Sequence, residues 1–197
     1  GRQAGGWAGR RELSRRRKWE GAQVESQVCD VSDLEAVVEL ANALPPIDVL
    51  IHNAGDMLSK LEYTDQGLER ITATHVVGPY LLTERLRQLD KLNAKDGARV
   101  IFVSSGGMYT QALDVHALCE FGKRYDGVSH YAQTKRAQVV LAQMHDNDQG
   151  SGVRFAAMHP GWVDTPALRR AMPLFKFLTA PILRRAEEGA DTLVWLA

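Results

Sequence analysis

Three short apolar runs, separated by helical segments, constrain the fold of this chain more than any other feature. The runs cover residues 47–51, 100–103 and 153–158. The run 100–103 is continuously apolar, and the other two each contain one charged residue, Asp48 and Arg154. Each run ends in a turn rich in small or polar residues, as expected of a strand that is buried on both faces. Segments with helical periodicity lie between them, at 64–92 and 129–144. This alternation predicts an α/β fold with a doubly wound parallel sheet and helices on both faces.

The flanking segments extend the same alternation. Residues 23–29 are expected to form a further strand, followed by a helix in which Ser32 is the N-cap and Glu35 reaches back to it. Pro45 and Pro46 end that helix, because proline lacks the N–H that a helical hydrogen bond needs. Residues 190–197 are expected to lie in one more helix.

Composition excludes several classes of protein. With 197 residues, 45% of them hydrophobic, the chain is expected to form one domain. Lysine plus arginine and aspartate plus glutamate both number 24, which argues against binding to nucleic acid or to an anionic membrane. Cys29 and Cys119 do not have the spacing of a zinc site or of a disulfide framework, and the six histidines fit no metal motif. No apolar stretch approaches the ~18 residues of a membrane helix, so a cytoplasmic location is expected.

Small and polar residues follow each of the three predicted buried strands. These clusters are Asn53, Ala54 and Gly55; Ser104, Ser105, Gly106 and Gly107; and Pro160 with Gly161. Because the carboxyl ends of parallel strands meet at one edge of a sheet, the three clusters are expected to line one ligand crevice.

Tyr131 and Lys135 are four residues apart on the predicted helix 129–144, which places the phenol and the ammonium on one face. Free tyrosine titrates near pH ~10, and a neighbouring cation that lowers this pKa by about three units, or about 4 kcal/mol, would suit proton transfer near neutrality. A buried tyrosine beside a solvated lysine is the alternative for such a pair taken alone.

Together these residues resemble the short-chain dehydrogenase/reductase family over residues 23–197. The resemblance implies a Rossmann-like fold and an NAD(P)-dependent oxidoreductase that interconverts a carbonyl and an alcohol by hydride transfer. Within the family, the chain most resembles one subgroup, and residues 103–108, 131–136 and 158–166 carry this closer resemblance.

The resemblance also assigns roles to individual residues. Tyr131 is implied to be the general acid or base, Ser105 to bind the substrate oxygen, with Ser104 as the competing serine, and Lys135 to hold the nicotinamide ribose. The residues implied to bind the cofactor are Asp30, Val31, Asn53, Ala54, Gly55, Tyr131, Lys135, Pro160, Gly161 and Thr165.

The chain departs from the family pattern at two histidines. His75 stands where the family usually has an asparagine that completes the catalytic set. A fourth catalytic role for His75 through a water relay and a purely structural role both remain open. His52 replaces another family asparagine, beside the retained Asn53.

The glycine-rich phosphate loop of the family has no clear counterpart. Residues 1–7 are a near miss that no strand precedes, and only 23 residues separate Trp7 from Asp30 where the fold needs roughly 45. The sequence therefore predicts a basic, poorly matched segment at 1–22 and a partial domain at 23–197 that lacks the first β-α-β unit and the last strand. Weak cofactor binding by this chain alone is expected.

The remaining expectations concern cofactor, substrate and partners. Nearby arginines and the resemblance favour NADP over NAD, and the apolar residues Leu174, Phe175, Phe177 and Leu178 weakly favour an apolar carbonyl or alcohol substrate. The family commonly forms homo-oligomers through its two long helices. A catalytically silent protein that binds a nucleotide or a partner is the second hypothesis, and nucleic-acid binding through Arg10 to Lys18 is the third.

Overall fold

The computed structural model describes residues 25–93, 97–121, 125–147, 152–164, 179, 181 and 183–197. These residues form a three-stranded sheet with strand order β1-β2-β3. The strands are β1, Val49–His52, β2, Arg99–Val103, and β3, Arg154–Met158. Both pairs are parallel, and Phe102 in the central strand lies opposite His52 and Ala157. The predicted α/β fold and the three buried strands are confirmed.

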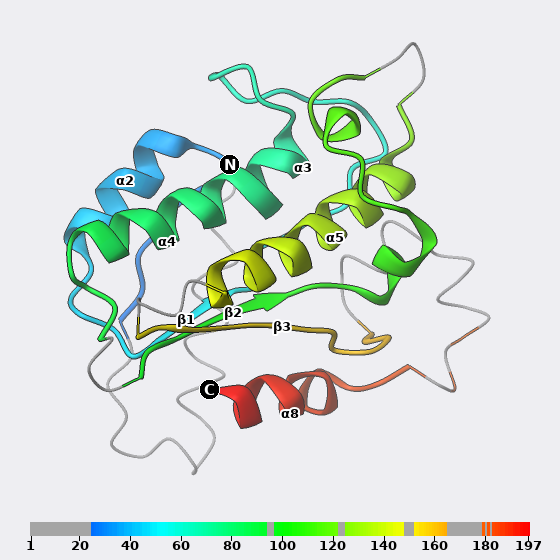
Figure 1. Cartoon of the computed structure of the whole chain (residues 1–197). Helices are drawn as coiled ribbons and strands as arrows, with labels where there is room; N and C mark the ends of the chain where they lie inside the picture. Colours follow the sequence, from blue (N-terminus) through cyan, green and yellow to red (C-terminus); the bar gives the residue numbers. More distant parts are fainter. Residues whose placement is uncertain are drawn as a thin grey trace.

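Helices cover both faces of the sheet, as predicted (Figure 1). On one face lie α2, Leu34–Ala43, α4, Gly78–Gln88, and α5, Gly127–Asp146. Their buried residues Val37, Leu82, Leu86 and Ala142 form one core with the alternate strand residues Leu50, Val100, Phe102 and Phe155. On the other face α8, Ala186–Leu196, packs Leu193 and Leu196 against Ile101, Val103 and Met158. Cover on both faces explains why the strands are largely apolar, although Arg99 and Arg154 at the strand starts are exposed and Ile51 in β1 is 40% exposed.

Two expected helix starts were wrong. The N-cap of α2 is Asp33, whose carboxylate accepts hydrogen bonds from the N–H groups of Glu35 and Ala36. Ser32 instead donates to the carboxylate of Asp30. The helix expected at 64–92 begins as α3, Arg70–Thr72, continues as a π-helical turn, Ala73–Val77, and ends with α4 at Gln88.

The strand expected at 23–29 is also wrong for the residues that are described. Residues 25–29 form no strand, and the side chain of Val28 is fully exposed. No strand within the described ranges lies beside them, so apolar residues with β propensity find no ladder to join.

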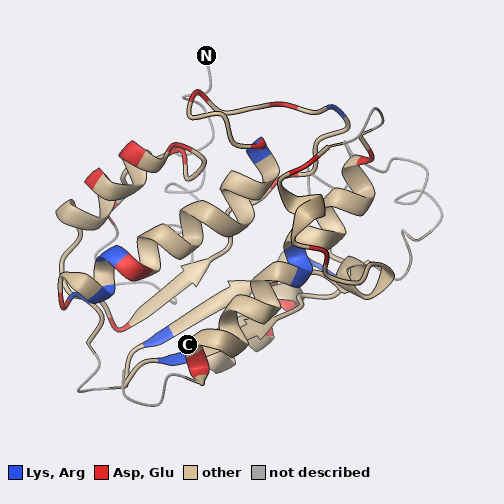
Figure 2. Cartoon of the chain, turned by 45° about the horizontal axis from the view of Figure 1, so that its top comes forward, with Lys and Arg blue, Asp and Glu red and all other residues tan. Residues whose placement is uncertain are grey.

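Two 3-10 turns, Gly106–Thr110 and His116–Leu118, connect β2 to α5. Acidic and basic residues are mixed over the chain, in keeping with its charge balance (Figure 2). In the part of the chain that the structure describes, no helix has both the length and the apolar character needed to cross a membrane.

Candidate active site

The carboxyl ends of the three strands lie around one buried lysine. The ammonium of Lys135 donates to the carbonyl of Val103 at the end of β2, with 2.8 Å between Nζ and O. A Cβ added to Gly55, after β1, would lie 3.6 Å from the same Nζ. The turn after β2 reaches β3 through the N–H of Gly106, which donates to Nδ1 of His159 at 3.0 Å. The three clusters that the sequence singles out therefore meet at one edge of the sheet.

Tyr131 and Lys135 share a face of α5, with Nζ 5.7 Å from the centre of the phenol ring. The expected lowering of the Tyr131 pKa is wrong for the structure as it stands. Burial raises that pKa above 10.0, and a side-chain hydrogen bond with Ser105 only partly offsets the increase. Desolvation of the phenolate outweighs the hydrogen bond with Ser105, so Tyr131 is protonated at neutral pH.

Burial also acts on Lys135, whose side chain is almost completely buried. It lowers the pKa of the ammonium from 10.5 to about 8. Two of its three N–H groups have partners, the carbonyl of Val103 and Oε1 of Gln138, at 2.8 and 3.1 Å. One N–H is left for a ligand hydroxyl, which fits the role that the family resemblance implies.

The two adjacent serines occupy different environments. Ser104 is buried and donates from Oγ to the backbone carbonyl of Lys135 at 2.7 Å. Ser105 is the N-cap of the 3-10 turn, where its Oγ accepts from the N–H of Gly107 at 3.2 Å. Its hydroxyl also interacts with Tyr131, so Ser105 is the serine beside the phenol.

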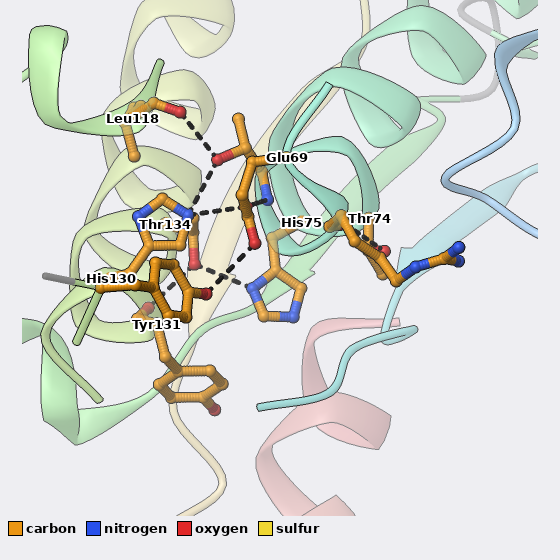
Figure 3. A network of polar contacts seen from close by, with 10 residues as sticks. Glu69, Thr74, His75, Leu118, His130, Tyr131 and Thr134 are labelled. Carbon is orange, nitrogen blue, oxygen red and sulfur yellow. Dashed lines mark hydrogen bonds and ion pairs between the residues drawn. The ribbon is translucent and has the colours of Figure 1, made fainter. Parts of the chain in front are cut away.

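His75 lies in the π-helical turn and is completely buried (Figure 3). Its Nε2 accepts from the N–H of Asp56 at 3.3 Å, and its Nδ1 is 2.9 Å from Oγ1 of Thr134. The Thr134 hydroxyl donates to the carbonyl of Tyr131, so the proton of His75 must sit on Nδ1. Burial holds the pKa of His75 well below 6.5. A neutral ring with both nitrogens engaged favours the structural role over a proton relay.

The residues expected to bind the adenosine half of a cofactor precede α2 and follow β1. Asn53, Ala54 and Gly55 are exposed. The carboxylate of Asp30 accepts from the N–H and Oγ of Ser32 at 2.9 and 2.7 Å and lies 3.5 Å from Arg70. A Cβ at Gly55 would come within 2.7 Å of Nε2 of His75, so only glycine lets the chain pass this close to the ring. The exposed residues 53–55 beside the remaining N–H of Lys135 fit a nicotinamide cofactor.

The residues expected at the nicotinamide end follow β3. Gly161 has a φ of 80°, which suits glycine, and a Cβ there would lie 3.0 Å from the Arg184 side chain. Pro160 precedes it at the same edge of the sheet. Thr165 and the apolar segment at 174–178 lie outside the described residues.

Sequence reasoning missed a polar stripe on α5 formed by His130, Thr134 and Gln138. All three are buried, at 5%, 0% and 0% exposure. Thr134 binds the ring of His75, and Nε2 of Gln138 donates to the His75 carbonyl at 2.9 Å. Their spacing of four residues, one position before Tyr131 and Lys135, is the signal that could have found them.

The parallel sheet with helices on both faces defines an α/β protein of the Rossmann-like class. Residues 9–173 match the family model described as short chain dehydrogenase. The chain belongs to the short-chain dehydrogenase/reductase family.

Individual relatives agree with this assignment. The chain is 41% identical to human dehydrogenase/reductase SDR family member 12 over 173 residues, which is 86% of this chain and 54% of that protein. It is 31% identical to human retinol dehydrogenase 12 over 178 residues, 87% of this chain and 55% of the relative. The subgroup predicted from the motifs, family member 12, is confirmed as a similarity. The chain spans about half the length of these relatives.

A solved structure shows the same fold. The short-chain dehydrogenase from Sphingobium yanoikuyae in complex with NADPH superimposes with a TM-score of 0.67 at 23% identity. The match covers 92% of this chain and 67% of that one.

Proposed function

We propose that this chain carries the catalytic residues of an NAD(P)-dependent oxidoreductase that interconverts a carbonyl and an alcohol. The observation that carries the proposal is the cluster of Ser105, Tyr131 and Lys135 at the carboxyl edge of the sheet. The Ser105 hydroxyl interacts with Tyr131, and Lys135 is anchored beneath them on Val103. A nicotinamide cofactor, when bound, supplies or accepts the hydride.

The protonation states suit reduction of a carbonyl. Tyr131 keeps its proton at neutral pH, so it can donate that proton to the oxygen of a carbonyl as negative charge develops there. Ser105 can donate a hydrogen bond to the same oxygen, because its Oγ accepts from Gly107 and its O–H lies beside the Tyr131 hydroxyl, where that oxygen would bind. In oxidation Tyr131 would act as the base, which requires a lowered pKa; the positive charge of an oxidised cofactor would act in that direction.

The cofactor would be held at three places. Asp30, Val31 and residues 53–55 would contact the adenosine half, Lys135 the nicotinamide ribose, and Pro160, Gly161 and Thr165 the nicotinamide amide. We propose NADP rather than NAD as this cofactor. The NADPH named with the Sphingobium structure is in keeping with this preference.

We further propose a small, apolar carbonyl or alcohol as the substrate. The name of one relative, retinol dehydrogenase 12, supports this choice. The test is a steady-state assay at saturating NADPH and NADH over a panel of carbonyls that differ in chain length and polarity, with Lys135→Met as the inactive control. Turnover of apolar carbonyls, faster with NADPH, is expected.

The second candidate is a catalytically silent protein that binds a nucleotide. The packing of His75, whose ring nitrogens are both engaged, favours it because the family's fourth catalytic group is then missing. One result would favour this candidate over the oxidoreductase: the chain binds cofactor in calorimetry but turns over no carbonyl of the panel faster than Lys135→Met does.

A further inference from the structure

A second buried polar network lies beside Tyr131, and none of the proposed catalytic steps uses it (Figure 3). At its centre Glu69 and His130 meet with 2.7 Å between Oε2 and Nε2. Their side chains are 1% and 5% exposed. The same oxygen of Glu69 accepts from the N–H of Thr72 at 2.6 Å, and its other oxygen accepts from the hydroxyl of Tyr125 at 3.2 Å.

The hydrogen bonds outweigh the cost of burying the carboxylate. Burial alone would raise the pKa of Glu69, but the hydrogen bonds from His130 and from the N–H groups of Thr72 and Ile71 hold it below 4.5. Glu69 is therefore an acceptor only, at neutral pH, and His130 must present an N–H to it.

Thr72 extends the network to the segment that precedes α5. Its hydroxyl donates to the backbone carbonyl of Leu118 at 3.0 Å, and its Oγ1 is 3.0 Å from Nε2 of His130. Because the single hydroxyl proton goes to Leu118, Oγ1 must accept from the Nε2–H of His130. The imidazole N–H is thus shared between Glu69 and Thr72, and it fixes the direction in which the Thr72 hydroxyl points.

The segment held in this way is short and otherwise lightly attached. Residues 114–120 include the turn His116–Leu118, and the N–H of Asp114 donates to Oε1 of Gln133 on α5 at 3.0 Å. Leu118 is buried, whereas Val115 and Cys119 beside it are exposed. At the carboxyl end of the segment, the ring centre of Phe121 lies 5.0 Å from that of His130.

We propose that Glu69, Thr72 and His130 form a polar latch that fixes residues 114–120 against the helix bearing Tyr131. The latch residues are positioning residues that contact neither substrate nor cofactor. Its relevance to turnover rests on the proposed function, since residues 114–120 join the Ser105 turn to the start of α5 and so border the place where a carbonyl would enter. His130 directly precedes Tyr131 on α5. The same imidazole therefore holds residues 114–120 and lies next to the catalytic tyrosine.

The test is hydrogen–deuterium exchange of the backbone amides of residues 114–120 in the 197-residue chain. Thr72→Val keeps the shape of the side chain and removes the hydroxyl, while Thr72→Ser keeps the hydroxyl and removes a methyl group. The latch requires exchange roughly five- to tenfold faster in Thr72→Val, the effect of losing one buried hydrogen bond, and close to wild type in Thr72→Ser.

Thr83→Val is the matched control, because Thr83 is also buried and its hydroxyl donates to the carbonyl of Pro79 and lies beside His52, elsewhere in the fold. It should leave residues 114–120 unchanged. Glu69→Gln, which keeps an oxygen for His130 and Thr72, should behave like the wild type, whereas Glu69→Leu should loosen the segment.

Unchanged exchange in Thr72→Val, or faster exchange in Thr72→Ser than in Thr72→Val, would overturn the latch, because the side chain would then act only by filling space. Equal acceleration in α2 and in residues 114–120 would do the same, since it would report global unfolding. None of these readouts needs turnover, so failure of the proposed oxidoreductase activity would leave them intact. In an active preparation, Thr72→Val should raise the KM for a carbonyl while the Kd for NADPH stays within about twofold of wild type.

Discussion

The burial of Lys135 has a measurable consequence for stability. The amine titrates at about 8 in the folded chain and at 10.5 when exposed. Below pH 8 both states carry the proton, and the folded state bears the full cost of a buried ammonium, about 3 kcal/mol at ~1.4 kcal/mol per pH unit. Between pH 8 and 10.5 only the unfolded chain keeps the proton, so stability must rise with pH over that interval.

The size of this rise can be calculated for a practical range of pH. From pH 7 to 9.5 the two pKa values give a gain of about 2 kcal/mol in the free energy of unfolding. Other groups titrate in the same interval, including Cys29, whose pKa is raised from 9.0 by burial and by neighbouring carboxylates. Comparison with Lys135→Met removes those contributions, because both proteins share them.

The assay is urea unfolding of the wild type and of Lys135→Met at pH 7, 8 and 9.5, followed by tryptophan fluorescence. Methionine has a similar length and carries no charge, so the loss of hydrogen bonds to Val103 and Gln138 shifts its curve by the same amount at every pH. The difference between the two proteins should change by about 2 kcal/mol across this range, in favour of the wild type at high pH. Parallel pH profiles would refute the argument that this amine is desolvated.

Two further substitutions test the packing around the crevice. Gly55→Ala places a Cβ 2.7 Å from Nε2 of His75, so the free energy of unfolding should fall by about 1–3 kcal/mol in the same urea assay. Gly107→Ala is the control and should leave the free energy of unfolding unchanged, because its Cβ would lie 3.5 Å from Oγ of Ser105. Burial lowers the pKa of His52 from 6.5 to about 3. Between those values only the unfolded chain takes up the proton, so the free energy of unfolding decreases as the pH is lowered. Relative to His52→Gln, which can still bond Thr83, the wild type should lose about 2 kcal/mol between pH 7.5 and 5, and equal losses in the two proteins would exclude the buried neutral imidazole.

The strands and the general layout could be predicted from the sequence because they depend on local patterns. Continuous apolar runs such as 100–103 are typical of strands with helices on both sides, and Phe102 and Ile101 do face opposite layers. The start of α2 was misplaced by one residue, because Ser32 and Asp33 are both good N-caps. The choice between them depends on Asp30, because its carboxylate accepts a hydrogen bond from the Ser32 hydroxyl.

Other features depend on contacts between segments far apart in the sequence. The raised pKa of Tyr131 could not be foreseen, because spacing along a helix reports proximity to Lys135 and says nothing about desolvation. The hydrogen bond between the side chains of His75 and Thr134 joins residues that are 59 positions apart. Glu69 and His130 are 61 positions apart, and although the spacing of His130, Thr134 and Gln138 indicates a polar face of the helix, it does not identify Glu69 as the partner of His130.

Transfer of hydride under the control of Tyr131 is the central claim, and deuterium transfer tests it most directly. NADPH deuterated at the transferable position would be mixed with an apolar carbonyl, and label in the alcohol product measured for the wild type and for Tyr131→Phe, with cofactor affinity determined in parallel. Label should appear with the wild type, and Tyr131→Phe should bind NADPH with unchanged affinity but form labelled alcohol at least ~100-fold more slowly. Equal rates of labelling in the two proteins would contradict the proposed role of the phenol.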